Sequence, residues 1–170
     1  RFSRGHSGVQ IEVTVCRNAD LLDAMQEGAL DLALAWHTRG ETPYMDILGS
    51  YPLHWIGPGD ASLLDGDWPA PAEGPLPLVS IEAPCRLRSA ATQALDAAGI
   101  PWRVVYSSPS LGGVWAAVAA GLGVAVRTSF GLPRSLALLA PGEHALPALP
   151  RVELALHRSH QQLAPAAARL

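Results

Sequence analysis

Apolar and polar positions follow two different periods in the first part of this chain. The stretch VQIEVTV at residues 9–15 alternates apolar and polar side chains and contains β-branched residues, which predicts a strand. Leucine and methionine then recur near helical spacing over 19–30, and Gly28 weakens the end of that predicted helix. The apolar run at 30–36 indicates a buried strand. The chain is therefore expected to open as strand–helix–strand with parallel strands.

The same patterns continue along the rest of the chain and predict a second α/β unit. Strands are expected at 53–56, 77–82, 102–107, 124–128 and 152–158, with helices at 85–99 and 110–121. A stretch rich in proline, glycine and aspartate at 58–77 is the best candidate for a boundary, and the alanine-rich tail is expected to form a short helix. Two α/β lobes joined by crossovers would enclose a cleft between them.

The amino-acid composition excludes several classes of function. The net charge is −3, and all 12 basic residues are arginines, so lysine Schiff-base chemistry and a Walker-type lysine are excluded. Because there is no basic stripe, this segment is not expected to grip nucleic acid by itself. No apolar run approaches the roughly 20 residues that span a bilayer. The first residues, RFSRGH, include no initiating Met, and we expect the sequence to be part of a longer protein.

Side chains that could hold a metal or a cofactor are sparse. Cys16 and Cys85 are far apart, form no C-x-x-C pair, and are expected to be free, reduced and partly buried. His157 and His160 lie three residues apart without a cysteine or carboxylate pattern beside them, so both are assigned to the surface. The sequence therefore predicts no metal site and no cofactor.

The segment SSPSLGGVWAAVAAGLGVAVRT at 107–128 allows three interpretations. A phosphate loop needs glycines between a strand and the following helix, whereas Gly121 and Gly123 follow a helix and precede a strand. A serine-nucleophile turn would fit Ser108-Pro109-Ser110-Leu111-Gly112 by its place between strand and helix, although serine replaces the first glycine. Ser110 would then need a downstream histidine as its base, with a glutamate to orient it.

Ligand binding is the third interpretation, and it fits the order of the elements best. Ser107, Ser108 and Ser110 lie at the carboxyl end of a parallel strand, where open α/β folds bind their ligands. A helix N-terminus with hydroxyl groups beside it suits a carboxylate or another polar small molecule. Capping of the helix by Ser110 alone is the structural alternative.

The order of these motifs resembles a known family. GVQIEV followed by LLDAMQEGALDLAL is similar to the first lobe of the effector-binding domain of LysR-type transcriptional regulators, and AAVAAGLGVAV is similar to their V-A-A-G-L-G-I segment. WRVVYSSPSLGGVWAAVAAGLGVAVRTSFGLP further resembles the branch that includes repressors of motility and secreted-enzyme genes. The resemblance covers nearly the whole chain.

This resemblance implies an α/β fold of the type 2 periplasmic-binding-protein class: two Rossmann-like lobes with two crossovers. Lobe I would comprise 1–56 and 157–170, without its first strand, and lobe II would comprise 57–156. The family also implies a cytoplasmic, non-enzymatic regulator that forms homodimers or homotetramers. It would bind a small-molecule effector, and it would contact DNA only through an N-terminal winged helix-turn-helix that lies outside this sequence.

The family's cleft, carried onto this sequence, falls on strand ends and helix starts. The effector-binding residues are then expected to be Arg17, Asn18, Trp36, His37, Pro84, Cys85, Arg86, Ser108, Ser110 and Thr128. The two arginines and the serine-flanked helix start together suggest an anionic effector. A solute-binding component of a transporter, which shares the fold, and a serine hydrolase remain the alternatives.

Overall fold

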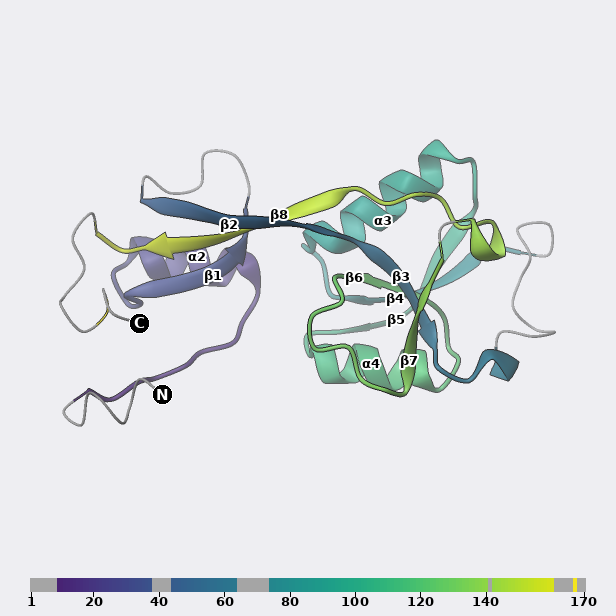
Figure 1. The fold of residues 1–170 in the computed structure, drawn as a ribbon, viewed down its shortest axis with the longest axis horizontal. Helices are drawn as coiled ribbons and strands as arrows, with labels where there is room; N and C mark the ends of the chain where they lie inside the picture. The colour runs from purple at the N-terminus through teal and green to yellow at the C-terminus, as the bar shows by residue number, and fades with distance from the viewer. Residues whose placement is uncertain (1–8, 38–43, 64–73, 141, 161–166, 168–170) are drawn as a thin grey trace. The chain divides into compact units, whose positions relative to one another are not determined.

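The computed structural model describes residues 9–37, 44–63, 74–140, 142–160 and 167, and it divides the chain into two compact units (Figure 1). Unit 1 comprises residues 1–51 and 152–170, and unit 2 comprises residues 52–151. The chain passes between the units at 51/52 and at 151/152, in each case five residues before the lobe boundary that the resemblance implies. The stretch 58–77 does not separate the units, because it lies within unit 2; its residues 64–73 are outside the described ranges.

Unit 1 is a small sheet with one helix packed on it. Its elements are α2 (Asn18–Gln26), β1 (Leu32–Trp36), β2 (Met45–Pro52) and β8 (Arg151–Arg158), and the sheet order is β1-β8-β2. Leu22 and Met25 of α2 are buried, as are Ala33 and Ala35 of β1. The small alanine side chains allow the helix to approach the sheet closely, and Gly28 (φ +72°) ends α2 where the sequence predicts.

The strand expected at 9–15 is not formed. Residues 9–17 have no regular secondary structure, and Val13 and Val15 are 78% and 92% exposed. Alternation alone does not make a strand, because its backbone groups need a neighbouring strand to pair with. Among the described residues β1 pairs with β8, and this pairing is antiparallel. The parallel strand–helix–strand opening is therefore wrong for this structure, although the helix and the strand at 30–36 are confirmed.

His157 is also placed differently from the surface position expected from sequence. It lies opposite Ala33 in the β1–β8 register and is 0% exposed, whereas His160 is exposed. Side chains alternate between the two faces of a strand, so His157 shares the buried face of β8 with Ala155. A pair of histidines three residues apart therefore does not share one surface here.

Unit 2 is an α/β unit whose strands run mostly as the sequence predicts. Its strands are β3 (His54–Pro58), β4 (Leu76–Ile81), β5 (Trp102–Ser108), β6 (Ala125–Arg127) and β7 (Leu136–Leu139). Strands β4 and β5 are parallel, and β3 pairs antiparallel with both β6 and β7. Two short 3-10 turns, η1 (Ala61–Leu63) and η2 (Glu143–Ala145), complete it. Strand β7 was not predicted, because its four residues LALL lie inside a proline-rich segment.

Two helices cover opposite sides of the unit 2 strands (Figure 1). Helix α3 (Arg86–Ala97) follows β4, and α4 (Leu111–Ala119) follows β5. Both end before a glycine with positive φ, Gly99 (+66°) and Gly121 (+75°), as expected for helix termination in the left-handed region. Among the described residues, no helix is long and apolar enough to cross a membrane.

The link between β4 and β6 depends on Gly123. The Val124 N–H donates to Pro77 O at 3.0 Å, and the Val79 N–H donates to Val124 O at 2.8 Å, so the two strands run parallel at Leu78 and Val124. A Cβ at position 123 would lie 2.4 Å from Pro77 O. Glycine is therefore required here by close backbone approach rather than by a turn.

Replacing this glycine should destabilise unit 2. We expect Gly123→Ala to lower the free energy of unfolding by about 1–3 kcal/mol, because backbone atoms must move to make room. Gly112→Ala is the control: its Cβ would lie 3.5 Å from Ser110 Oγ within α4, and alanine favours a helix. Urea unfolding followed by circular dichroism compares them. A Gly123→Ala protein as stable as wild type would contradict the packing constraint.

Asn18 joins the start of α2 to the end of β1. Its side-chain Nδ2 donates to Trp36 O at 3.2 Å, and its Oδ1 accepts from the Trp36 N–H at 2.8 Å. The amide therefore satisfies the backbone of an edge strand as a neighbouring strand would. This arrangement fixes the place of residues 36 and 37 relative to the helix.

Removal of this amide should loosen unit 1. Asn18→Ala is expected to cost about 1–3 kcal/mol in the free energy of unfolding, because both backbone partners lose a hydrogen bond in a half-buried place. Gln26→Ala, at the exposed last residue of α2, should change it by less than about 0.5 kcal/mol. Equal urea midpoints for the two variants would show that the Asn18–Trp36 contact is not needed.

Candidate functional site

Polar side chains gather where the parallel strands of unit 2 end. Ser108 ends β5 opposite Ile81 of β4, and Thr128 directly follows β6. Cys85 and Ser110 occupy the N-cap positions of α3 and α4. Carboxyl ends of parallel strands and the helix starts that follow them are the usual binding edge of an open α/β sheet. Four of the ten residues expected from the sequence therefore share this edge.

The serines fix the start of α4. Ser108 is 8% exposed, and its Oγ accepts a hydrogen bond from the Ser110 N–H at 3.1 Å. Ser110 is exposed and makes no side-chain capping bond. A Cβ on Gly113 would lie 2.6 Å from Ser108 Oγ, so α4 packs directly on this hydroxyl. Ser108 therefore has a positioning role, and the first N–H groups of α4 are not capped by the Ser110 side chain.

The same geometry bears on the two other interpretations of this segment. Within the described residues, the Ser108 and Ser110 hydroxyls have no hydrogen bond to a histidine or a carboxylate, which a nucleophilic serine needs for activation. Gly121 ends α4 and Gly123 permits the contact between β4 and β6. These glycines thus have structural roles, and neither lies at a helix N-terminus.

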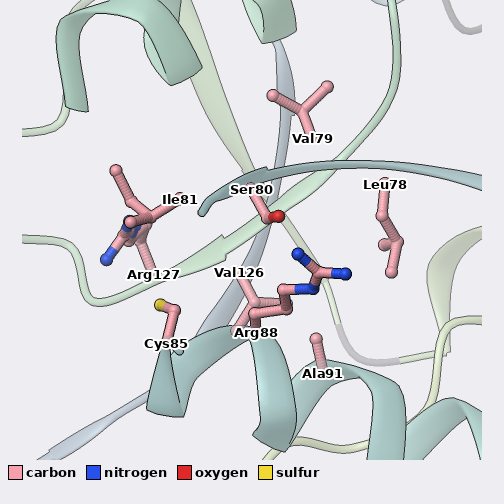
Figure 2. Close-up of a pocket in the computed structure, with 9 residues that line it drawn as sticks. All are labelled: Leu78, Val79, Ser80, Ile81, Cys85, Arg88, Ala91, Val126 and Arg127. Carbon is pink, nitrogen blue, oxygen red and sulfur yellow. The ribbon is translucent and has the colours of Figure 1, made fainter. Parts of the chain in front are cut away.

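At the start of α3, the arginine that lines a pocket is not the one expected from the sequence. Pro84 and Arg86 are exposed, whereas Cys85 is half-buried. Cys85 lines a pocket together with Arg88 and Arg127, and Arg86 is not among the residues that line it (Figure 2). Each residue of a helix is rotated about 100° from the one before it, so Arg86 and Arg88, two residues apart, point to nearly opposite sides of α3.

Sequence reasoning missed Arg88 and Arg127. Arg127 lies within the predicted strand VAVRT, and a residue inside an apolar strand does not by itself indicate a binding role. A signal was nevertheless present: Arg127 immediately precedes Thr128, which was selected because it ends that strand. Burial lowers the pKa of the Arg127 guanidinium from its ordinary value, and the charge interaction with Cys85 opposes this change.

The four expected residues of unit 1 lie at the start of α2 and the end of β1. Arg17 forms a bidentate ion pair with Asp20, with Nε–Oδ2 at 2.9 Å and Nη2–Oδ1 at 3.0 Å. Asn18 binds the backbone of Trp36, as described above. The His37 N–H donates to Glu153 O at 2.7 Å. Trp36 and His37 are half-buried.

Cysteines and metal-binding groups give no further site in the described part of the chain. Cys16 and Cys85 are both free; Cys16 is exposed rather than partly buried, because residues 9–17 do not pack as a strand. No cluster of three or more histidine, cysteine, aspartate or glutamate side chains that could hold a metal is found among the described residues.

Comparison with known proteins identifies the family. The family profile described as the LysR substrate binding domain matches residues 1–170. The chain is 32% identical over 151 residues to the HTH-type transcriptional regulator PecT of Dickeya dadantii, covering 89% of this chain and 45% of PecT. It is 33% identical over 156 residues to the HTH-type transcriptional regulator DgdR of Burkholderia cepacia, covering 92% of this chain and 50% of DgdR.

The fold agrees with this assignment. The regulatory domain of CcmR from Synechocystis PCC6803, solved in complex with 2-PG, superposes with a TM-score of 0.74 at 20% identity. The match covers 99% of this chain and 83% of that domain. This chain spans about half the length of the two curated relatives. Its two α/β units thus have the fold expected from the sequence, and the chain belongs to the LysR substrate-binding domain family.

Proposed function

We propose that this chain is the effector-sensing part of a LysR-type transcriptional regulator, and that binding of a small anionic molecule changes how the whole protein binds DNA. The observation that supports this most directly is the group of polar residues at the carboxyl ends of the unit 2 strands, in a chain of the LysR substrate-binding family. CcmR, which shares the fold, was solved in complex with 2-PG, an example of a ligand on such a domain.

The regulatory effect of a ligand depends on its preference for one state of the protein. A ligand that binds two conformations equally well shifts nothing, however tightly it binds. The proposed effector must therefore contact groups whose arrangement changes with the state. Uncapped N–H groups at the start of α4 and the buried Thr128 after β6 can select a polar ligand of defined shape.

The proposal also assigns the remaining parts of the regulator. A helix-turn-helix domain, as the names of PecT and DgdR indicate for those proteins, would precede residue 1 and contact DNA. The regulator would act in the cytoplasm as a homodimer or homotetramer. Because this chain contains no lysine and has a net charge of −3, DNA contacts are assigned to the preceding domain.

The reading frame upstream of the Arg1 codon tests this arrangement directly. We expect it to encode a winged helix-turn-helix and a linker helix in about 100 codons, which is an ordinary length for one domain. An upstream secretion signal followed directly by this chain would contradict the regulator and would favour a solute-binding protein of a transporter.

Effector sensing is tested with the full-length regulator and a fluorescent DNA fragment from the region upstream of its own gene. Small acidic metabolites are added singly, and anisotropy reports DNA binding. For a metabolite that changes DNA binding, Thr128→Val should raise the metabolite concentration that gives half of the maximal anisotropy change by roughly fivefold. The reason is that one hydrogen bond to a ligand contributes about 1 kcal/mol. Thr92→Val on α3 is the matched control and should leave that concentration unchanged. Identical responses from the two variants would remove Thr128 from the site.

A further inference from the structure

The sheet of unit 1 has an open edge at β1. Among the described residues the strand order is β1-β8-β2, so β1 pairs with β8 on one side and with no strand on the other (Figure 1). The His37 N–H donates to Glu153 O at 2.7 Å, and at the other end of β1 the Ser159 N–H donates to Asp31 O at 3.1 Å. Residues 31, 33, 35 and 37 therefore direct their backbone groups toward β8.

The backbone groups of the alternate residues of β1 point to the open edge. These residues are Leu32, Leu34 and Trp36. The Asn18 side chain bonds both the N–H and the C=O of Trp36 there, at 2.8 Å and 3.2 Å. In the described part of the chain, no strand or side chain does the same for Leu32 and Leu34. The edge can therefore take a strand that reaches Leu34 and ends before Trp36.

The same strand has an exposed apolar side chain on one face of the sheet. Helix α2 packs on the face that carries Ala33 and Ala35, and both are buried. Leu34 lies on the opposite face, beside the half-buried Leu156 of β8, and its side chain is 57% exposed. An apolar strand with an open edge pairs readily with other chains, and native proteins cover such edges. We therefore expect a neighbour for β1 in the intact protein.

Residues 9–15 have the pattern of a further strand of this sheet. Ile11, Val13 and Val15 alternate with polar residues and are 42%, 78% and 92% exposed. In a strand all three would share one face. Helix α2 connects this segment to β1, and strands on either side of such a crossover run parallel in one sheet. No pairing joins the two segments, which lie apart in Figure 1, and one strand between them would pair with both.

Relatives of this chain contain additional residues that could form such a strand. The match to the CcmR regulatory domain uses 99% of this chain but 83% of that domain, so part of that domain has no counterpart here. The chain also spans about half of PecT and of DgdR. A parallel strand beside residues 9–15 needs a crossover of about a dozen residues or more to reach them. The polypeptide that leads into residue 9 is in the place to make this connection.

We propose that a segment preceding Arg1 in the longer protein forms a strand between residues 9–15 and β1 and so completes the sheet of unit 1. This strand bonds to the open backbone groups of Leu32 and Leu34, and the Asn18 side chain takes its place at Trp36. Residues 9–15 form the next strand, which turns their apolar face inward. The inference does not depend on an effector, because the open edge belongs to β1 whatever the unit binds.

Photo-crosslinking in the full-length protein identifies what covers β1. The photoreactive residue p-benzoylphenylalanine is placed at Leu34, and crosslinked peptides are identified by mass spectrometry in a mixture of ¹⁵N-labelled and unlabelled protein. We expect a crosslink within one chain to a peptide encoded upstream of Arg1. The same group at Gln26, the exposed last residue of α2, is the control and should not reach that peptide. Crosslinks from position 34 only to residues 9–170, or to a second copy, would overturn the proposal.

Hydrogen exchange of the unmodified full-length protein keeps the test decisive if the crosslinking variant fails to fold. The amides of residues 11–15 and of Leu32 and Leu34 should exchange at least about a hundredfold more slowly than in an unfolded chain, because each lies in a paired strand. This protection should not change when the protein is diluted, since the added strand belongs to the same polypeptide. Exchange of residues 11–15 at the rate of an unfolded chain, or protection lost on dilution, would contradict the added strand.

The added strand and the proposed function can fail separately. An upstream secretion signal together with the expected crosslink would leave the strand in place and overturn the regulator. An upstream helix-turn-helix without the crosslink and without protection of residues 11–15 would support the regulator and overturn the strand. Where both hold, the DNA-binding domain is joined to the middle of the unit 1 sheet, next to β1.

Discussion

The parallel contact between β4 and β6 is the constraint on which unit 2 depends. It requires the backbone of residue 123 to pass so close to Pro77 O that no side chain fits. From this contact the two strands run in the same direction, so Ile81 and Arg127 lie equally far along from the Leu78–Val124 bridge. The helix start at Cys85 and the half-buried side chain of Arg127 both come to line the same pocket through this register. Gly123, which in the sequence only follows a helix and precedes a strand, therefore helps to set the register of the two strands that line the pocket.

Much of unit 2 could be predicted from the sequence because its local signals agree with its tertiary structure. The elements from β4 to β6 carry apolar runs, helix starts and terminal glycines in the expected order, and each formed. Prediction failed at 9–15, where a good local pattern has no neighbouring strand among the described residues. It failed again at His157, where the strand register rather than the residue type decides burial.

The candidate site was predicted by position better than by residue. Strand ends and helix starts are visible in a sequence, so Cys85, Ser108 and Thr128 lie at the kinds of position from which they were chosen: a helix start, the end of β5 and the residue after β6. Which arginine side chains turn toward the pocket depends on helix phase and strand pairing, which composition does not reveal. The absence of lysine has a physical consequence here: a lysine buried at position 127 could release its proton, whereas a guanidinium retains its charge.

The path of the chain through the two units sets an order for its synthesis. Unit 2 is one continuous segment whose ends meet, since the Leu53 N–H donates to Pro150 O at 3.2 Å. Unit 1 is discontinuous: β1 leaves the ribosome more than a hundred residues before β8, the strand it pairs with from Leu32–Arg158 to Trp36–Leu154. Unit 2 can therefore fold while β1 still waits for its partner. During translation the apolar strand LALAW remains an open edge, and a nascent chain that stalls within unit 2 exposes it to other chains and to chaperones.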